Sequence, residues 1–124
     1  MTSATIDVLL VDDDGDVREA LADCLTAAGY QVATCSNGLA ALDWLRAAPR
    51  PPGLVLLDMM MPVMDGWQFR EEQLAHPSLA AVPVVMLSAR YDTPAHAGVE
   101  QLRKPIRARD LVAVVARYCG GGAG

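Results

Sequence analysis

The 124-residue sequence lacks both of the features that would place a protein in a membrane or outside the cell. No apolar run approaches the roughly 20 residues of a membrane-spanning helix. The first residues, MTSATIDVLL, contain neither the basic segment nor the cleavage pattern of a signal peptide. We therefore expect a cytoplasmic protein that does not contact a membrane.

Positive charge is also scarce. The chain has 10 lysines and arginines against 15 aspartates and glutamates, which gives a formal net charge of −5. Nucleic-acid-binding proteins usually present a clustered basic face, and here only Arg103, Lys104, Arg107 and Arg109 lie close together. Four cations near one loop are more typical of local pairing, so we expect no nucleic-acid partner.

The three cysteines, Cys24, Cys35 and Cys119, are odd in number and lack the spacing of metal ligands. They indicate reduced, packed thiols rather than a disulfide framework or a zinc site. The two histidines, His76 and His96, lie in polar stretches near prolines, and we interpret both as surface loop residues.

The composition, with 52% hydrophobic and 20% charged residues, is ordinary for one globular domain. The sequence has no internal repeat, no linker and no sign of a second domain. We predict one domain over residues 1–119, followed by a flexible glycine-rich tail at residues 120–124.

Short apolar runs alternate along the chain with segments whose apolar residues recur at helical spacing. The runs predict strands at residues 6–11, 30–34, 54–57, 82–87 and 100–103, and the helical segments lie between residues 15 and 29 and at about 39–47, 66–75 and 108–119. This alternation favours an α/β fold, in which helices cover both faces of a parallel sheet.

The link between the last two predicted strands is short. A parallel crossover normally needs a dozen or more residues, and only residues 89–99 are available here. Thr93 and Pro94 could start a helix that Gly98 would end after about one turn, so we expect the fourth crossover helix to be shortened or missing. Thin cover over these strands would favour a partner protein or a weak homodimer, and a well-packed loop on a monomer is equally consistent with the sequence.

Polar residues stand where the predicted strands end. Asp12 and Asp13 follow the first strand, Asp58 follows the third, Ser88 closes the fourth and Lys104 ends the fifth. Because parallel strands of an open sheet end at one edge, we expect these side chains to meet there. Three neighbouring carboxylates need a cation, and a set of oxygen ligands alone suits Mg²⁺.

The same set of residues predicts a reaction. A lysine and a hydroxyl beside a metal can donate to the oxygens of a phosphoryl group, which indicates phosphoryl transfer to a carboxylate. Asp58 would be the nucleophile. No histidine lies near these strand ends to act as a general base, and a carboxylate nucleophile needs none.

Four motifs in this order, VDDD at 11–14, DMMMPVMDG at 58–66, SAR at 88–90 and KP at 104–105, resemble those of the receiver domains of two-component response regulators, the CheY-like family. The resemblance covers about residues 6–118. It implies a flavodoxin-like, doubly wound, five-stranded parallel sheet with strand order 2-1-3-4-5. It also implies that the phosphoryl group comes from a sensor histidine kinase or a histidine phosphotransfer protein, and that an unknown downstream protein reads the result.

The resemblance assigns roles to the acidic residues. It makes Asp58 the phosphoacceptor and Asp13 and Asp58 the carboxylates that bind Mg²⁺. Asp12 would act on the metal through water, and Met60 would give the metal its backbone carbonyl. Such a domain catalyses only its own phosphorylation and dephosphorylation, so we do not expect an enzyme with a separate substrate.

The resemblance also assigns the groups that contact the phosphoryl oxygens. Ser88 takes the place of the switch hydroxyl, and Lys104 would bridge the phosphoryl group and Asp58. The backbones of Met59 and Ala89 would contact the phosphoryl group. The Lys104–Pro105 peptide is expected to be cis, which would aim the lysine into the site.

The sequence departs from the family pattern at Gln101, where members usually have Tyr or Phe three positions before the lysine. A rotating aromatic side chain therefore cannot transmit the signal in this chain. Gln101 and the short crossover together suggest an alternative function, that of a pseudo-receiver, which binds proteins without being phosphorylated. Met60 and Arg90 flank the site, and we expect their bulk to slow hydrolysis of the acyl phosphate.

A phosphatase of the haloacid dehalogenase type is a further alternative, because Asp12 and Asp14 form an Asp-x-Asp motif at a strand end. Asp12 would then be the nucleophile and Asp14 the general acid. This alternative leaves Asp58 without a role and lacks a cap domain. We interpret Asp14 and Asp16 instead as charges at a helix N-terminus.

Overall fold

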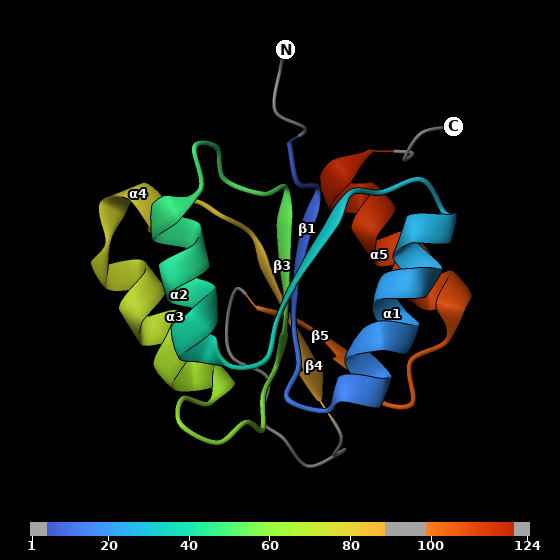
Figure 1. Cartoon of the computed structure of the whole chain (residues 1–124), viewed down its shortest axis with the longest axis horizontal. Coiled ribbons are helices and arrows are strands. Elements are labelled where there is room, and N and C mark those ends of the chain that lie inside the picture. Colours follow the sequence, from blue (N-terminus) through green and yellow to red (C-terminus); the bar gives the residue numbers. More distant parts are fainter. Residues whose placement is uncertain (1–4, 89–98, 121–124) are drawn as a thin grey trace.

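The computed structural model describes residues 5–88 and 99–120. Within these residues the strands form one parallel sheet in the order β2-β1-β3-β4-β5, as predicted. The strands are β1 (Val8–Val11), β2 (Val32–Cys35), β3 (Leu54–Asp58), β4 (Val84–Ser88) and β5 (Glu100–Arg103). The sheet is seen nearly edge-on in Figure 1, with the carboxyl ends of β1 and β3 at its lower edge.

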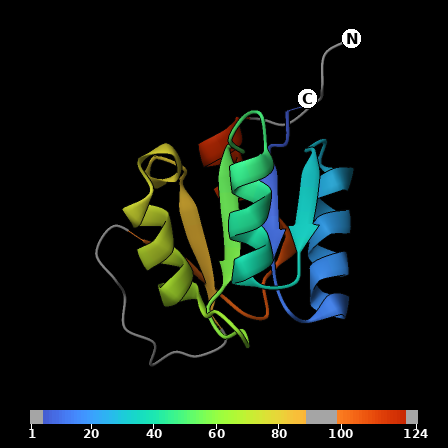
Figure 2. The same ribbon diagram turned by 60° about the vertical axis from the view of Figure 1, so that its left-hand side comes forward.

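Helices cover both faces of the sheet (Figures 1 and 2). On one face lie α1 (Gly15–Ala27) and α5 (Ala108–Cys119), and on the other lie α2 (Gly38–Ala47), α3 (Gly66–Ala75) and the short α4 (Pro77–Ala80). None of the helices in the described ranges is long and apolar enough to span a bilayer.

The central strands are buried on both faces, which explains why they are continuous apolar runs in the sequence. Every residue of β1, β3 and β4 is buried. Side chains alternate between two cores. The core beneath α2 and α3 includes Leu9, Val11, Val55, Leu57, Phe69 and Met86, and the core beneath α1 and α5 includes Val8, Leu10, Leu54, Leu56, Val85 and Leu111. Each such side chain stabilises the fold by about 1.5–3 kcal/mol through burial.

Carboxylates fix where two helices begin. Asp14 is the N-cap of α1, and its Oδ1 accepts from the N–H groups of Asp16 and Val17 at 3.0 and 3.2 Å. Asp65 starts α3 through a capping box: its Oδ1 accepts from the N–H of Gln68 at 2.9 Å, and Gln68 Oε1 accepts from the N–H of Asp65 at 2.9 Å. The interpretation of Asp14 as a helix-start charge is confirmed.

Some predicted boundaries were wrong. β1 and β4 each begin two residues later than predicted, and β2 spans Val32–Cys35 rather than 30–34. Just before β1, Asp7 forms two hydrogen bonds with Gln31 that are not part of the regular strand pairing. The N–H of Gln31 donates to Asp7 Oδ2 at 2.8 Å, and the N–H of Asp7 donates to the carbonyl oxygen of Gln31 at 2.9 Å. Pro83 lacks an N–H and precedes β4.

Helix α4 was not predicted. His76 ends α3 and serves as the N-cap position of α4, and Pro77 occupies the first helical position, which it favours. The residue His76 is partly buried, and its Nδ1 lies 2.8 Å from the carbonyl oxygen of Glu72 in an exposed contact. His76 lies in the bend between α3 and α4 and is partly exposed, in line with its interpretation as a surface loop residue, although its ring also makes a local contact.

Other predictions are confirmed. The Lys104–Pro105 peptide is cis. Cys24, Cys35 and Cys119 are free and half-buried. The predicted short helix around residues 93–98 lies outside the described residues, as do Ala89, Arg90 and His96.

Candidate functional site

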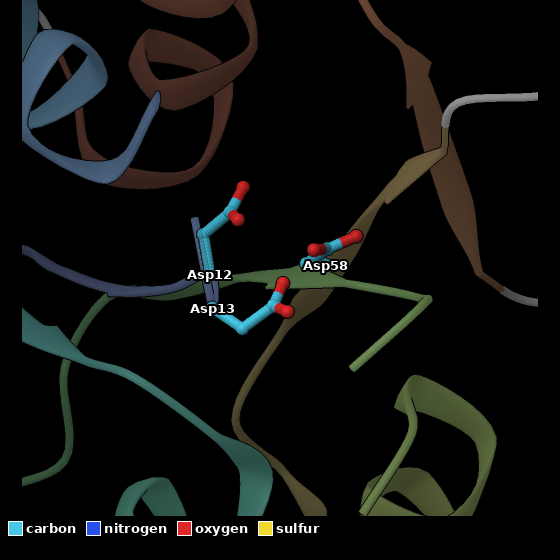
Figure 3. A group of neighbouring side chains, drawn as sticks. All are labelled: Asp12, Asp13 and Asp58. Carbon is cyan, nitrogen blue, oxygen red and sulfur yellow. The ribbon is translucent and has the colours of Figure 1, made fainter. Parts of the chain in front are cut away.

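Three carboxylates meet at the carboxyl edge of the sheet. Asp12 and Asp13 follow β1, and Asp58 is the last residue of β3. One oxygen from each lies within 4.8 Å of the others. Figure 3 shows the side chain of Asp13 directed toward Asp58, with Asp12 beside them. Asp12 and Asp58 are buried and Asp13 is exposed, so the cluster opens to solvent at Asp13.

Lys104 brings a cation to this cluster from the end of β5. Its Nζ donates to Asp12 Oδ2 at 2.8 Å and lies 3.5 Å from Asp58 Oδ2. The lysine is held at the sheet edge because its N–H donates to the carbonyl oxygen of Ser88 at 2.6 Å. The predicted convergence of Lys104 on the acids is therefore present: its ammonium group donates its shorter hydrogen bond to Asp12 and also forms an ion pair with Asp58.

Backbone N–H groups hold the two buried carboxylates. Asp12 Oδ1 accepts from the N–H of Asp14 at 2.9 Å, and Asp58 Oδ1 accepts from the N–H of Met60 at 3.2 Å. Both bonds reach two residues ahead, as in an Asx turn, and they fix the carboxylates where the strands end.

The predicted backbone contact of Met59 needs correction. Its N–H donates to the carbonyl oxygen of Leu87 at 3.0 Å, and its carbonyl accepts from the N–H of Gly66 at 2.9 Å. The backbone of Met59 is thus used by the sheet and by the start of α3. The N–H of Met60 is the backbone donor that faces the Asp58 carboxylate.

Ser88 ends β4, next to the strand that carries Asp58. It is 2% exposed, and its neighbour Leu87 is the register partner of Asp58. The next residue, Ala89, was predicted to contact the phosphoryl group through its backbone, and it lies outside the described residues.

The environment of Asp58 disfavours its charge. Burial and the neighbouring charge of Asp12 raise the pKa of Asp58 to about 7, against the lowering effects of Lys104 and of the Met60 N–H. Burial alone would lower the pKa of Lys104, but its hydrogen bond to Asp12 and the charges of Asp58 and Asp12 raise that pKa above its ordinary value. Lys104 therefore stays cationic at neutral pH.

The donor set fits a hard divalent cation. Asp12, Asp13 and Asp58 offer only oxygen ligands, and the exposed side of the cluster leaves room for water. Mg²⁺ takes one or two carboxylates and keeps several waters, so this arrangement suits it. A cation here would also offset the repulsion that raises the pKa of Asp58.

Sequence reasoning missed two features of this edge. The Nη1 of Arg18 donates to the carbonyl oxygen of Asp12 at 2.7 Å. The signal was available, because side chains in the first turn of a helix point back toward its start. Val63, in the loop after β3, has a positive φ of 73°, which is unusual for a β-branched residue. No pattern in the sequence predicted the positive φ of Val63.

Comparisons with known proteins agree with this geometry. A family model described as the response regulator receiver domain matches residues 8–116. Among curated proteins, the transcriptional regulatory protein GltR of Pseudomonas aeruginosa is 36% identical over 113 residues, which cover 86% of this chain and 46% of that protein. The chain thus spans about half the length of this relative.

Solved structures are similar over nearly the whole chain. A putative response regulator from Chloroflexus aurantiacus is 30% identical with a TM-score of 0.83, over 94% of this chain and 98% of the other. The receiver domain of a sensor histidine kinase from Pseudomonas aeruginosa, solved with a magnesium ion coordinated in its active site cleft, is 25% identical with a TM-score of 0.83, over 94% and 99%.

Proposed function

Because the chain belongs to the response regulator receiver domain family, we propose that it takes a phosphoryl group onto Asp58 from a sensor histidine kinase or a histidine phosphotransfer protein. The observation that carries this proposal is the position of Asp58. It is buried at the end of β3, with an oxygen 3.5 Å from Lys104 Nζ and within reach of two further carboxylates. A carboxylate in such a place would otherwise only destabilise the fold.

The transfer is a displacement at phosphorus. An oxygen of Asp58 attacks, and an O–P bond forms as the P–N bond to the donor histidine breaks. The imidazole nitrogen keeps the electron pair and takes up a proton. In this proposal Lys104 Nζ and the N–H of Met60, which both lie beside Asp58, donate to phosphoryl oxygens, and Ser88 is a further donor.

Asp13 and Asp58 are the proposed magnesium ligands, with the Met60 carbonyl as a third and Asp12 acting through water. Bound Mg²⁺ would screen the repulsion between the attacking carboxylate and the phosphoryl oxygens. The magnesium ion in the related kinase receiver domain supports this proposal.

The domain acts on itself alone in this proposal, by gaining and losing one phosphoryl group, and it signals through protein contacts. The phosphatase alternative has little support. The carboxylate of Asp14 caps α1 by accepting from the N–H groups of Asp16 and Val17, so it is not free to act as the general acid that this alternative needs.

The pseudo-receiver alternative stays open because of Gln101, which replaces the aromatic residue usual in the family. Beryllofluoride, which mimics a phosphoryl group on a carboxylate, separates the two. With Mg²⁺ present, a phosphorylatable receiver should bind it, as followed by ¹⁹F NMR, and the Asp58→Asn variant should not. A parent protein that shows no signal of bound beryllofluoride, like the Asp58→Asn variant, would favour the pseudo-receiver.

A further inference from the structure

Arg18 contacts the backbone of the acidic cluster rather than its carboxylates. It is half-buried in the first turn of α1, and its Nη1 donates to the carbonyl oxygen of Asp12 at 2.7 Å. The guanidinium folds back over the start of the helix, where its Nη2 would lie 3.7 Å from a Cβ placed on Gly15. A charged donor makes this a strong hydrogen bond.

The location of this arginine is unfavourable by itself. A cation near the N-terminus of a helix opposes the helix dipole. Asp14 and Asp16 lie in the same turn and offset that cost, and the carbonyl of Asp12 accepts the guanidinium directly. The position of Arg18 is therefore explained by its hydrogen bond to the carbonyl oxygen of Asp12 and not by a general attraction to the acidic surface.

The contact restrains the peptide that leads to Asp13. The carbonyl of Asp12 and the N–H of Asp13 belong to one planar unit. On its other side Asp12 is held by the sheet, since its N–H donates to the carbonyl oxygen of Cys35 at 3.2 Å. Asp13 is exposed, so packing does not set its direction. Its direction therefore depends on the backbone that Arg18 holds and on the contact of the Asp13 carboxyl group with Asp58.

We propose that Arg18 is a positioning residue for the divalent-cation site. By holding the peptide between Asp12 and Asp13, it directs the Asp13 carboxylate toward Asp58 and so increases the affinity for Mg²⁺. This inference rests on the proposed magnesium site. The charge of Arg18 acts in the opposite direction, because a nearby cation repels Mg²⁺, so the sign of the effect of a neutral substitution separates positioning from charge.

The test compares Arg18→Met and Arg18→Lys with the parent by calorimetric titration with MgCl₂. Arg18→Met keeps much of the side-chain stem and removes the donors, and it should weaken Mg²⁺ binding about tenfold, at the lower end of the effect of losing a group that orients a ligand. Arg18→Lys keeps a donor and should stay within about threefold of the parent by the same reasoning. Arg50→Met is the matched control, because Arg50 is exposed in the loop before β3, at the opposite edge of the sheet.

Mg²⁺ affinity in Arg18→Met that equals or exceeds that of the parent would overturn the proposal, and so would a lysine variant as weak as the methionine variant. Thermal unfolding of each variant separates a loss of stability from a loss of affinity. If Arg18→Met does not fold, Arg18→Gln, which is neutral and too short to reach the carbonyl, takes its place.

A second readout needs no metal. In ¹H–¹⁵N spectra of metal-free protein, the amide signal of Asp13 should move in Arg18→Met and stay in place in Arg50→Met, since the Asp13 N–H shares the peptide that Arg18 holds. An unmoved signal would overturn the proposal. A parent protein that binds no Mg²⁺ would instead refute the proposed metal site and with it the effect on affinity, while the Asp13 signal would still show whether Arg18 holds this peptide.

Discussion

Asp58→Asn should make the metal-free protein more stable, although it removes the proposed phosphoacceptor. Asparagine keeps the shape of the side chain and an oxygen for the N–H of Met60, and it removes a charge that burial and Asp12 both disfavour. Lys104 keeps its hydrogen bond to Asp12. The substitution therefore relieves repulsion without leaving a new unpaired charge.

The size of the effect follows from the pKa of Asp58. A rise from 3.8 to about 7 corresponds to about 4 kcal/mol at 1.36 kcal/mol per pH unit. Solvent at the rim of the site screens part of this energy, so we expect a gain of about 1–2 kcal/mol at pH 8.

The pH dependence has a definite sign. The native pKa of Asp58 lies above its unfolded value, so the native state binds more protons between about pH 4 and 7. The stability of the parent should therefore fall as pH rises through this window, and the asparagine variant should lack that part of the decline. The gap between the two should be largest at pH 8 and small at pH 4.

Urea unfolding in EDTA at pH 4, 6 and 8 measures this gap. Asp23→Asn is the control, because Asp23 is exposed on α1, and its stability should stay within about 0.5 kcal/mol of the parent. An Asp58→Asn protein that is less stable than the parent at pH 8, or a gap that does not change with pH, would refute the reasoning.

Three further predictions concern the loop after β3 and the core. Val63→Asn should raise the free energy of unfolding by about 1 kcal/mol, because asparagine tolerates the positive φ and the valine side chain is 77% exposed; a less stable variant in urea unfolding would contradict this. Met60→Asn should speed the loss of the phosphoryl group from Asp58, because the Met60 side chain, 69% exposed beside the site, is expected to hinder the attack of water on the acyl phosphate. An unchanged rate of phosphoryl loss, followed by intact mass, would contradict this role of Met60. Leu56→Ala should cost about 2–5 kcal/mol, because Leu56 is fully buried beneath α1 and α5; a loss below about 1 kcal/mol in the same urea assay would mean that the site collapses around the smaller side chain.

The sequence predicted the sheet well where burial is two-sided. Runs such as LVLLD in β3 are too short for a helix and end in a carboxylate, so strand and site were found together. β5, EQLR, has one apolar residue and was placed only by its position before Lys104. The strand starts were missed because contacts such as that of Asp7 with Gln31 join segments far apart in the sequence.

The site was predicted as a set of residues but not as a set of contacts. Parallel strands end at one edge, so the meeting of Asp13 and Asp58 followed from topology. Which oxygen Lys104 would reach did not, because a long side chain has many rotamers. The backbone of Met59 was predicted to contact the phosphoryl group, but it is the N–H of Met60 that faces the Asp58 carboxylate. This depends on the conformation of the turn after β3, and a turn has no periodic sequence pattern from which it could be predicted.

The measurement that tests the central claim most directly is intact mass after incubation with Mg²⁺ and acetyl phosphate, for the parent and for Asp58→Asn. Phosphorylation of Asp58 predicts a gain of one phosphoryl group in the parent that EDTA abolishes and that the variant lacks. A phosphoryl group gained equally by the Asp58→Asn variant would contradict the account, and so would a parent that gains none from acetyl phosphate and also binds no beryllofluoride.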